Sequence, residues 1–140
     1  MHKSISFNQR IHPAADASIL TVSSAALYGK GIFTTIAIHE GKPFLWEKHW
    51  RRLTQNAVTV GIDCSEFQEQ TVADALAAII ERNGVVNGRA RITFFDESPS
   101  EIWNYESERQ TSLLITTADR RDIPENFKLT VSPYSITTPS

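Results

Sequence analysis

The sequence contains one cysteine, one methionine and no long apolar run among its 140 residues. A single cysteine excludes a disulfide framework and a cysteine-based zinc site, so Cys64 is expected to fill space and no metal site is predicted. The apolar runs are far shorter than the roughly 20 residues of a membrane span, and the N-terminus, MHKSISFNQR, has no apolar signal core. We therefore expect a cytoplasmic protein with no membrane segment.

A strong charge of either sign is also lacking. The 14 basic and 16 acidic residues give a formal net charge of -2, which argues against a nucleic-acid or anionic-membrane partner bound through bulk charge. Any anion site must therefore be local. The composition, 41% hydrophobic and 21% charged, is that of an ordinary globular chain of about one domain.

Runs rich in β-branched and aromatic residues, bounded by Gly and Pro, predict short strands. They are expected at Ser4–His12, Gly31–His39, Pro43–Leu45, Arg89–Phe95, Thr111–Thr117 and Lys128–Ser132. The second and third of these are joined by a turn at Glu40-Gly41, which predicts a hairpin.

Two helices are expected between these strands. The first begins at Trp46 and ends near Gly61, because its apolar residues recur at helical spacing; this stripe is Trp46, Trp50, Leu53 and Ala57. The second follows a capping box formed by Ser65 and Gln68 and stops at Asn83-Gly84; its stripe is Val72, Ala75, Leu76, Ile79 and Ile80. The predicted fold is α+β in two layers, with a mainly antiparallel sheet and two principal helices on one face.

The first helix carries a candidate anion-binding residue. His49, Arg52 and Asn56 lie together beside the apolar stripe, whereas Arg51 points elsewhere. A guanidinium at the edge of a core offers a fork of donors suited to phosphate or carboxylate. The residues alone favour a simpler interpretation of both side chains. Arg52 would be an ordinary surface arginine, and His49 would be a helix-edge histidine without a binding role.

Two further motifs bear on binding. The Gly-Lys-Gly sequence at 29–31 enters a strand and not a helix, so phosphate-loop and dinucleotide mechanisms are rejected. Arg89 and Arg91 alternate onto one strand face with Thr93 and Phe95, which indicates either a carboxylate site or a solvated sheet face.

One block carries a family resemblance. Residues 27–57 read LYGKGIFTTIAIHEGKPFLWEKHWRRLTQNA. This order of glycine turn, Phe-bearing strand, hairpin and His-x-x-Arg-Leu helix resembles the N-terminal signature of the class IV (fold type IV) pyridoxal-phosphate enzymes. That family comprises branched-chain aminotransferases, D-amino acid aminotransferases and aminodeoxychorismate lyases. A weaker likeness extends to FNQRIHPAADASIL, ARITFF and LTVSPYS.

The resemblance implies roles for particular residues. Arg52, with His49 beside it, would bind the phosphate of pyridoxal 5'-phosphate. Phe33 and Thr35 would face an amino-acid substrate, and Arg91 would bind its carboxylate. The family forms homodimers, so a homodimer is expected, and the Phe-Thr-Thr sequence is closest to the lyase branch.

The sequence also departs from the family. Ala37 stands where aminotransferases often have Arg or Lys, and 95–97 read Phe-Asp-Glu where Thr-Arg-Gly is common. The substrate is therefore unassigned, and aminotransferase and lyase activities both stay open.

The catalytic lysine is the largest difference. In the family an aldimine-forming lysine follows the Ser-Pro-containing strand, and none of the lysines present stands at that position: Lys3, Lys30, Lys42, Lys48 and Lys128. We therefore expect residues 1–133 to be the N-terminal domain and 134–140 the start of a linker, with the lysine beyond Ser140 and this chain inactive alone. The alternative is a non-catalytic α+β module that binds a small anion or a protein partner.

Overall fold

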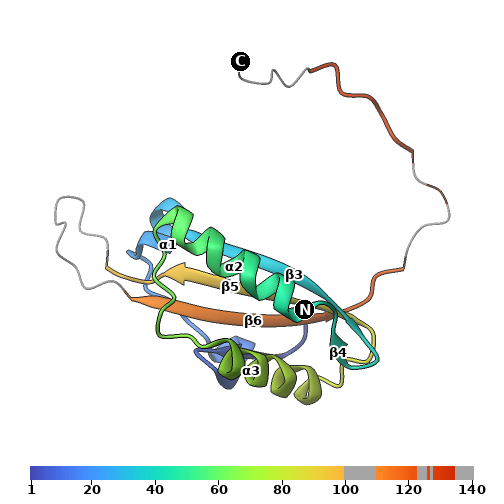
Figure 1. Ribbon diagram of the computed structural model, residues 1–140, viewed down its shortest axis with the longest axis horizontal. Coiled ribbons are helices and arrows are strands. Elements are labelled where there is room, and N and C mark those ends of the chain that lie inside the picture. The colour runs from blue at the N-terminus through green and yellow to red at the C-terminus, as the bar shows by residue number, and fades with distance from the viewer. Residues whose placement is uncertain (100–109, 123–125, 127, 135–140) are drawn as a thin grey trace.

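The computed structural model describes residues 1–99, 110–122, 126 and 128–134. Its elements, in order, are β1 (Ser4–Phe7), β2 (Arg10–Pro13), the 3-10 helix η1 (Ala14–Asp16), α1 (Ser24–Tyr28), β3 (Gly31–His39), β4 (Lys42–Pro43), α2 (Trp46–Val60), α3 (Glu69–Arg82), β5 (Gly88–Asp96) and β6 (Thr111–Asp119). The strands form one sheet in the order β2-β1-β6-β5-β3-β4 (Figure 1). Each neighbouring pair is antiparallel.

The alternation of side chains along β3, β5 and β6 gives this sheet two different faces. The face toward the helices is aliphatic and buried, because every second residue of a strand points to the same side. Its central side chains are Ile36, Ile38, Ala90, Ile92, Phe94, Leu113 and Ile115. The residues between them form the opposite face, which is open along β3.

The helix α2 covers the buried face with the stripe expected from its sequence. Leu53 and Ala57 are buried, and Trp46 and Trp50 pack against the core. The two tryptophan rings stack at 5.7 Å between centroids, and Trp50 meets the ring of Phe94 edge-on at 6.1 Å. The predicted orientation of α2 is confirmed.

The helix α3 packs beside β1 and β6, and its five buried residues are those expected: Val72, Ala75, Leu76, Ile79 and Ile80. With α2 and α3 contributing to one core, the predicted α+β class, with two principal helices on one face of an antiparallel sheet, is confirmed. No helix within the described ranges is both long and apolar enough to cross a membrane.

The expected single strand at Ser4–His12 is wrong, because the chain folds there into the hairpin of β1 and β2. Asn8 and Gln9 both have positive φ, 46° and 65°, which is the geometry of a two-residue hairpin turn. Asn8 also fixes the hairpin to β6, since its side-chain oxygen accepts from the backbone N–H of Leu113 at 2.8 Å.

The capping box expected before α3 is also wrong. The helix begins at Glu69, and its N-cap, Gln68, makes no side-chain capping hydrogen bond. The N–H of Ser65 instead donates to the carboxylate of Asp63 at 3.0 Å, so Ser65 belongs to a turn that precedes the helix.

The strand expected at Lys128–Ser132 is absent from the structure. These residues have no regular structure, and Figure 1 shows them away from the sheet. Leu129 and Val131 are 93% and 97% exposed. The strand pattern is present in the sequence, but a strand requires a hydrogen-bonding neighbour, and the described part of the chain offers this segment none.

An ion pair fixes the start of β3 to the end of β5. Lys30 lies 2.7 Å from the carboxylate of Asp96, whose side chain is 8% exposed, and the N–H of Asp96 donates to the carbonyl of Lys30 at 3.0 Å. Burial alone would raise the pKa of Asp96, but hydrogen bonds from Lys30 and Ser98, with the charge of Lys30, hold it below the ordinary value of 3.8.

Replacing Asp96 should therefore destabilise the protein in a pH-dependent way. Because the folded-state pKa is depressed, this contribution is present above the ordinary value and is lost as the pH falls through the folded-state pKa. Asp96→Asn should lower the free energy of unfolding at neutral pH by about 1–3 kcal/mol. The unfolding free energy of this variant should also fall less steeply at acidic pH than that of the unaltered protein. Denaturant unfolding at several pH values measures this, with the exposed Asp16→Asn as control. Equal stability of the two variants would contradict the role given to the ion pair.

Candidate anion and substrate site

A three-residue hydrogen-bonded cluster joins α2 to β3. The guanidinium Nη2 of Arg52 contacts the hydroxyl oxygen of Thr34 at 2.7 Å. The same hydroxyl lies 2.7 Å from Nδ1 of His49, and Nδ1 lies 3.5 Å from the guanidinium. We call Thr34, His49 and Arg52 the α2–β3 cluster. It brings together the two residues that the sequence placed on one edge of the helix.

The electrostatics of this cluster favour a neutral imidazole. Burial lowers the pKa of His49 below its ordinary value of 6.5, and the charge of Arg52 lowers it further. Near neutral pH the cluster therefore carries its positive charge on Arg52.

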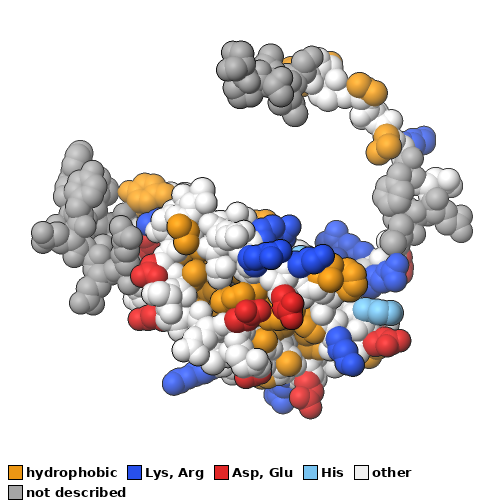
Figure 2. Space-filling model, in the orientation of Figure 1, with side chains coloured by type: hydrophobic (Ala, Val, Ile, Leu, Met, Phe, Trp, Pro, Cys, Tyr) orange, Lys and Arg blue, Asp and Glu red, His pale blue; other side chains and the backbone are white. Residues whose placement is uncertain are grey.

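A pocket of about 160 Å³ opens beside the cluster. It is lined by Leu45, the N-cap of α2, and by Lys48, His49 and Arg52, which recur along one face of the helix. Lys48 and Arg52, four residues apart, place two like charges on this face, an arrangement that is unfavourable without an anion between them. No carboxylate lines the pocket. Figure 2 shows Lys and Arg side chains gathered over α2. The arrangement suits a small anion such as a phosphate group.

The other predicted site residues come together on the opposite face of the sheet. The guanidinium carbon of Arg91 lies 3.5 Å from the centroid of the Phe33 ring, a close cation–π contact. Thr35 is the register partner of Arg91 across β3 and β5. Phe33 is 54% exposed, so this group meets solvent.

The two groups are separated only by the strand β3. Thr34 points toward the helices, while its neighbours Phe33 and Thr35 point the other way. On the outer side of β3, β4 pairs with Ile38 and His39, and the N–H of Phe44, just after β4, donates to the carbonyl of Ala37 at 2.8 Å. Within the described residues, the first part of β3 is therefore an uncovered sheet edge between the two groups.

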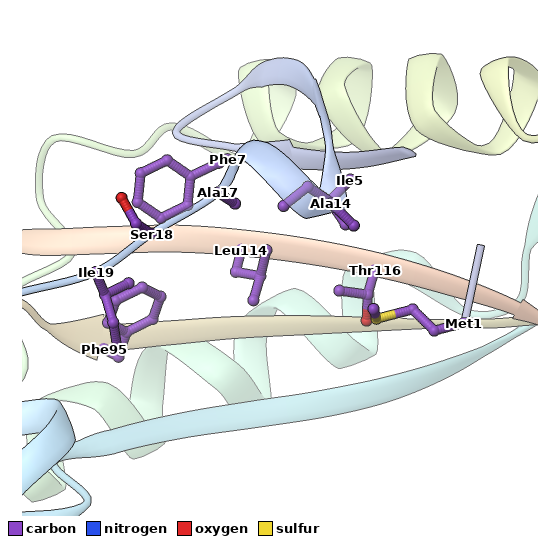
Figure 3. Close-up of a pocket in the computed structure, with 10 residues that line it drawn as sticks. All are labelled: Met1, Ile5, Phe7, Ala14, Ala17, Ser18, Ile19, Phe95, Leu114 and Thr116. Atoms are coloured by element: carbon purple, nitrogen blue, oxygen red, sulfur yellow. The ribbon is translucent and has the colours of Figure 1, made fainter. Parts of the chain in front are cut away.

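A shallow apolar groove lies farther along the open face, bordered by β1, β5, β6 and the segment after β2 (Figure 3). Its volume is about 240 Å³, and it is lined by Met1, Ile5, Phe7, Ala14, Ala17, Ser18, Ile19, Phe95, Leu114 and Thr116. Leu114 pairs with Thr93, and Thr116 pairs with Arg91. The groove is thus adjacent to the group formed by Phe33, Thr35 and Arg91.

Two site residues were missed in the sequence. Thr34 occupies an inward position in β3, in register with Ile36 and Ile38, and a polar residue there signals a need for hydrogen-bond partners. Lys48 lies one helical turn before Arg52, on the same face of α2. The inward position of Thr34 and the spacing of Lys48 can both be seen in the sequence, but neither shows which residue is the hydrogen-bond partner of Thr34.

Among the described residues, no cluster of three or more His, Cys, Asp or Glu side chains could hold a metal ion.

Comparison with known proteins identifies the family of the chain. The family description "Amino-transferase class IV" matches residues 31–138, which include β3, α2 and the site. The chain belongs to this family.

Among curated proteins, the chain is similar to the D-alanine aminotransferase of Staphylococcus epidermidis, with 27% identity over 73 residues, which are 52% of this chain and 26% of the relative. It is also similar to the aminodeoxychorismate lyase of Bacillus subtilis, with 28% identity over 85 residues, 61% of this chain and 29% of the relative. The matched segments thus span less than a third of either relative.

Among solved structures, the fold is that of a T.th. branched-chain amino acid aminotransferase solved with pyridoxamine 5'-phosphate. The TM-score is 0.75 at 18% identity, covering 86% of this chain and 40% of that one. This likeness shows that the chain has the fold of part of such an enzyme.

The depressed pKa of His49 gives a testable pH dependence. The unfolded state binds the proton more readily than the folded state, so the free energy of unfolding should fall as the pH drops below about 6.5. In Arg52→Gln the cationic neighbour is gone while burial remains, so the pKa should rise. An NMR titration of His49 between about pH 8 and pH 5 measures it. Arg51→Gln is the control, and a His49 pKa at or above 6.5 in the unaltered protein would contradict the assignment.

Proposed function

We propose that residues 1–133 are the N-terminal domain of a pyridoxal-phosphate-dependent aminotransferase or lyase that acts on an amino acid, and that residues 134–140 begin a linker. The observation that carries this proposal is the basic pocket at Arg52, in a chain of the class IV aminotransferase family. The family relationship supports pyridoxal phosphate as the cofactor, and the pocket supports Arg52 as the residue that binds its phosphate.

The residues of the pocket fit a phosphate group. Arg52 supplies a planar fork of donors, and its guanidinium is oriented by Thr34 at 2.7 Å. Lys48 adds a second cation, and His49 lines the same pocket. A phosphate dianion would relieve the repulsion between Lys48 and Arg52 and accept hydrogen bonds from both.

When bound, pyridoxal phosphate supplies an electron sink for the bond cleavages of amino-acid chemistry. The residues of this chain would hold its phosphate and orient the substrate. Arg91 is held over Phe33 and keeps in-plane donors for a substrate carboxylate. Thr35, beside Arg91, offers a hydroxyl on the same face.

The uncovered edge of β3 makes these two roles compatible. A ligand held by Arg52 on one side and by Phe33 on the other would have to pass from one face of the sheet to the other. At an internal strand the neighbouring strand would block that path. The pairing of β4 with Ile38 and His39 leaves the beginning of β3 open to such a ligand.

The proposal also includes a lysine and a second subunit. We expect the lysine that binds the cofactor beyond Ser140, in a second domain. We also expect the complete protein to form a homodimer. The apolar groove of Figure 3 supports a covering domain or subunit, since its lining residues Phe7, Ile19 and Leu114 are apolar side chains of the kind that such a partner buries.

The proposal is tested by comparing two adjacent arginines in the complete protein that carries this chain. Arg52→Ala removes a charge-assisted contact of about 1.5–3 kcal/mol, so the affinity for pyridoxal phosphate should fall roughly tenfold to a hundredfold. Arg51→Ala should change the affinity little, because Arg51, although equally exposed, does not line the pocket. A spectroscopic cofactor titration measures both, with thermal unfolding as the check on folding. Small, equal effects would refute the phosphate role of Arg52.

The position of the lysine gives a second test. The 140-residue chain, freed of host aminotransferases, should show no turnover of any amino acid with added pyridoxal phosphate, because the covalent step needs the lysine amine. Robust turnover would show that the lysine lies within these residues. A complete reading frame with no lysine after Ser140 would instead favour a non-catalytic anion-binding module.

A further inference from the structure

The hydrogen-bond directions in the α2–β3 cluster contain more information than the distances alone. The guanidinium of Arg52 can only donate, so the contact between its Nη2 and the hydroxyl oxygen of Thr34 at 2.7 Å uses that oxygen as an acceptor. The hydroxyl keeps one proton of its own. Thr34 is 2% exposed, so this proton needs a partner within the protein.

That partner is Nδ1 of His49, at 2.7 Å from the hydroxyl oxygen. The threonine proton can be donated there only if Nδ1 carries no proton. Nδ1 also lies 3.5 Å from the guanidinium of Arg52. Since a guanidinium can only donate, this contact likewise requires an unprotonated Nδ1. With a proton on Nδ1, two donors would face each other and the threonine proton would lose its acceptor.

A neutral imidazole with Nδ1 unprotonated carries its proton on Nε2. The low pKa of His49 agrees with a neutral ring. Because Nδ1 is directed at Thr34, Nε2 is the ring nitrogen that remains for the pocket, which His49 lines. An N–H group there adds a third donor to those of Lys48 and Arg52.

We propose that Thr34 is a positioning residue, which holds Arg52 and fixes His49 as the tautomer protonated on Nε2, so that the pocket presents only donors to a phosphate dianion. This inference rests on the proposed function, because it concerns the same pocket. A dianion has no proton of its own to place, and it is therefore matched to a site without acceptors.

Threonine suits this position for a physical reason. It has nearly the shape of valine and therefore fits among the aliphatic side chains of the core, such as Ile36 and Ile38. Its hydroxyl both accepts and donates, which lets one atom join a permanent donor to a histidine nitrogen. Valine would retain the packing and remove both hydrogen bonds, whereas serine would retain the hydroxyl.

The chain contains a matched control on the same face of the sheet, two strands away from Thr34. Thr117 in β6 is also 2% exposed. Its hydroxyl lies 2.8 Å from Nδ1 of His2 and accepts from the side-chain amide of Asn83 at 2.8 Å. Thr117→Val therefore removes the same kind of buried hydroxyl, with a comparable cost in stability, away from the pocket.

The test combines histidine nitrogen NMR with binding of two probes, inorganic phosphate and pyridoxal phosphate, in the complete protein. In the unaltered protein and in Thr34→Ser, the His49 resonances should show a protonated Nε2 and an unprotonated Nδ1 above about pH 7. In Thr34→Val the two nitrogens should become more alike as the tautomers mix. The affinity for both probes should fall about twofold to tenfold. Thr117→Val should leave the tautomer of His49 and both affinities unchanged.

Two results would overturn the inference. One is a proton on Nδ1 of His49 in the unaltered protein. The other is a Thr34→Val variant with the same His49 spectrum and the same affinities as the unaltered protein. Failure of the proposed function looks different: neither probe binds, and Arg52→Ala changes nothing, while the tautomer of His49 is still measured and still decides the role of Thr34.

Discussion

The hydroxyl of Thr34 sits in the part of β3 where the other inward side chains, Ile36 and Ile38, are aliphatic. A hydroxyl removed from water must be hydrogen-bonded, and in this fold its partners, Arg52 and His49, are both on α2. The requirement fixes how α2 lies on the sheet, because the helix must present that edge to β3 while its tryptophans enter the core. The orientation of the basic pocket follows from the same contact.

The sheet then divides the chemistry between its two faces. The helical face holds the basic pocket, and the open face holds Phe33, Thr35 and Arg91. The side-chain period of two separates these groups although their residues are adjacent in β3. The short strand β4 is important here, because its pairing leaves the start of β3 uncovered. A ligand in contact with both groups would pass over this edge.

Much of the fold could be predicted because local signals and burial agreed. The stripes of α2 and α3 and the bounds of β3 follow from periodicity that depends little on partners. The errors arose where partners decide the outcome. Asn8 and Gln9 bend one apparent strand into a hairpin, Ser65 is held in a turn by Asp63, and residues 128–132 have strand composition without a neighbouring strand. In each case the local pattern allows more than one structure.

The sequence by itself determined which face of α2 is buried and that His49 and Arg52 share an edge of it, because helical geometry fixes those directions once the apolar stripe is known. It also placed Phe33 and Thr35 on one face of β3, and Arg91 on one face of β5. Only the tertiary structure decided that Thr34, distant in sequence from Arg52, joins that arginine to His49, and that Arg91 stacks on Phe33. Those contacts depend on the register between strands and on the position of the helix over the sheet, which no local pattern encodes.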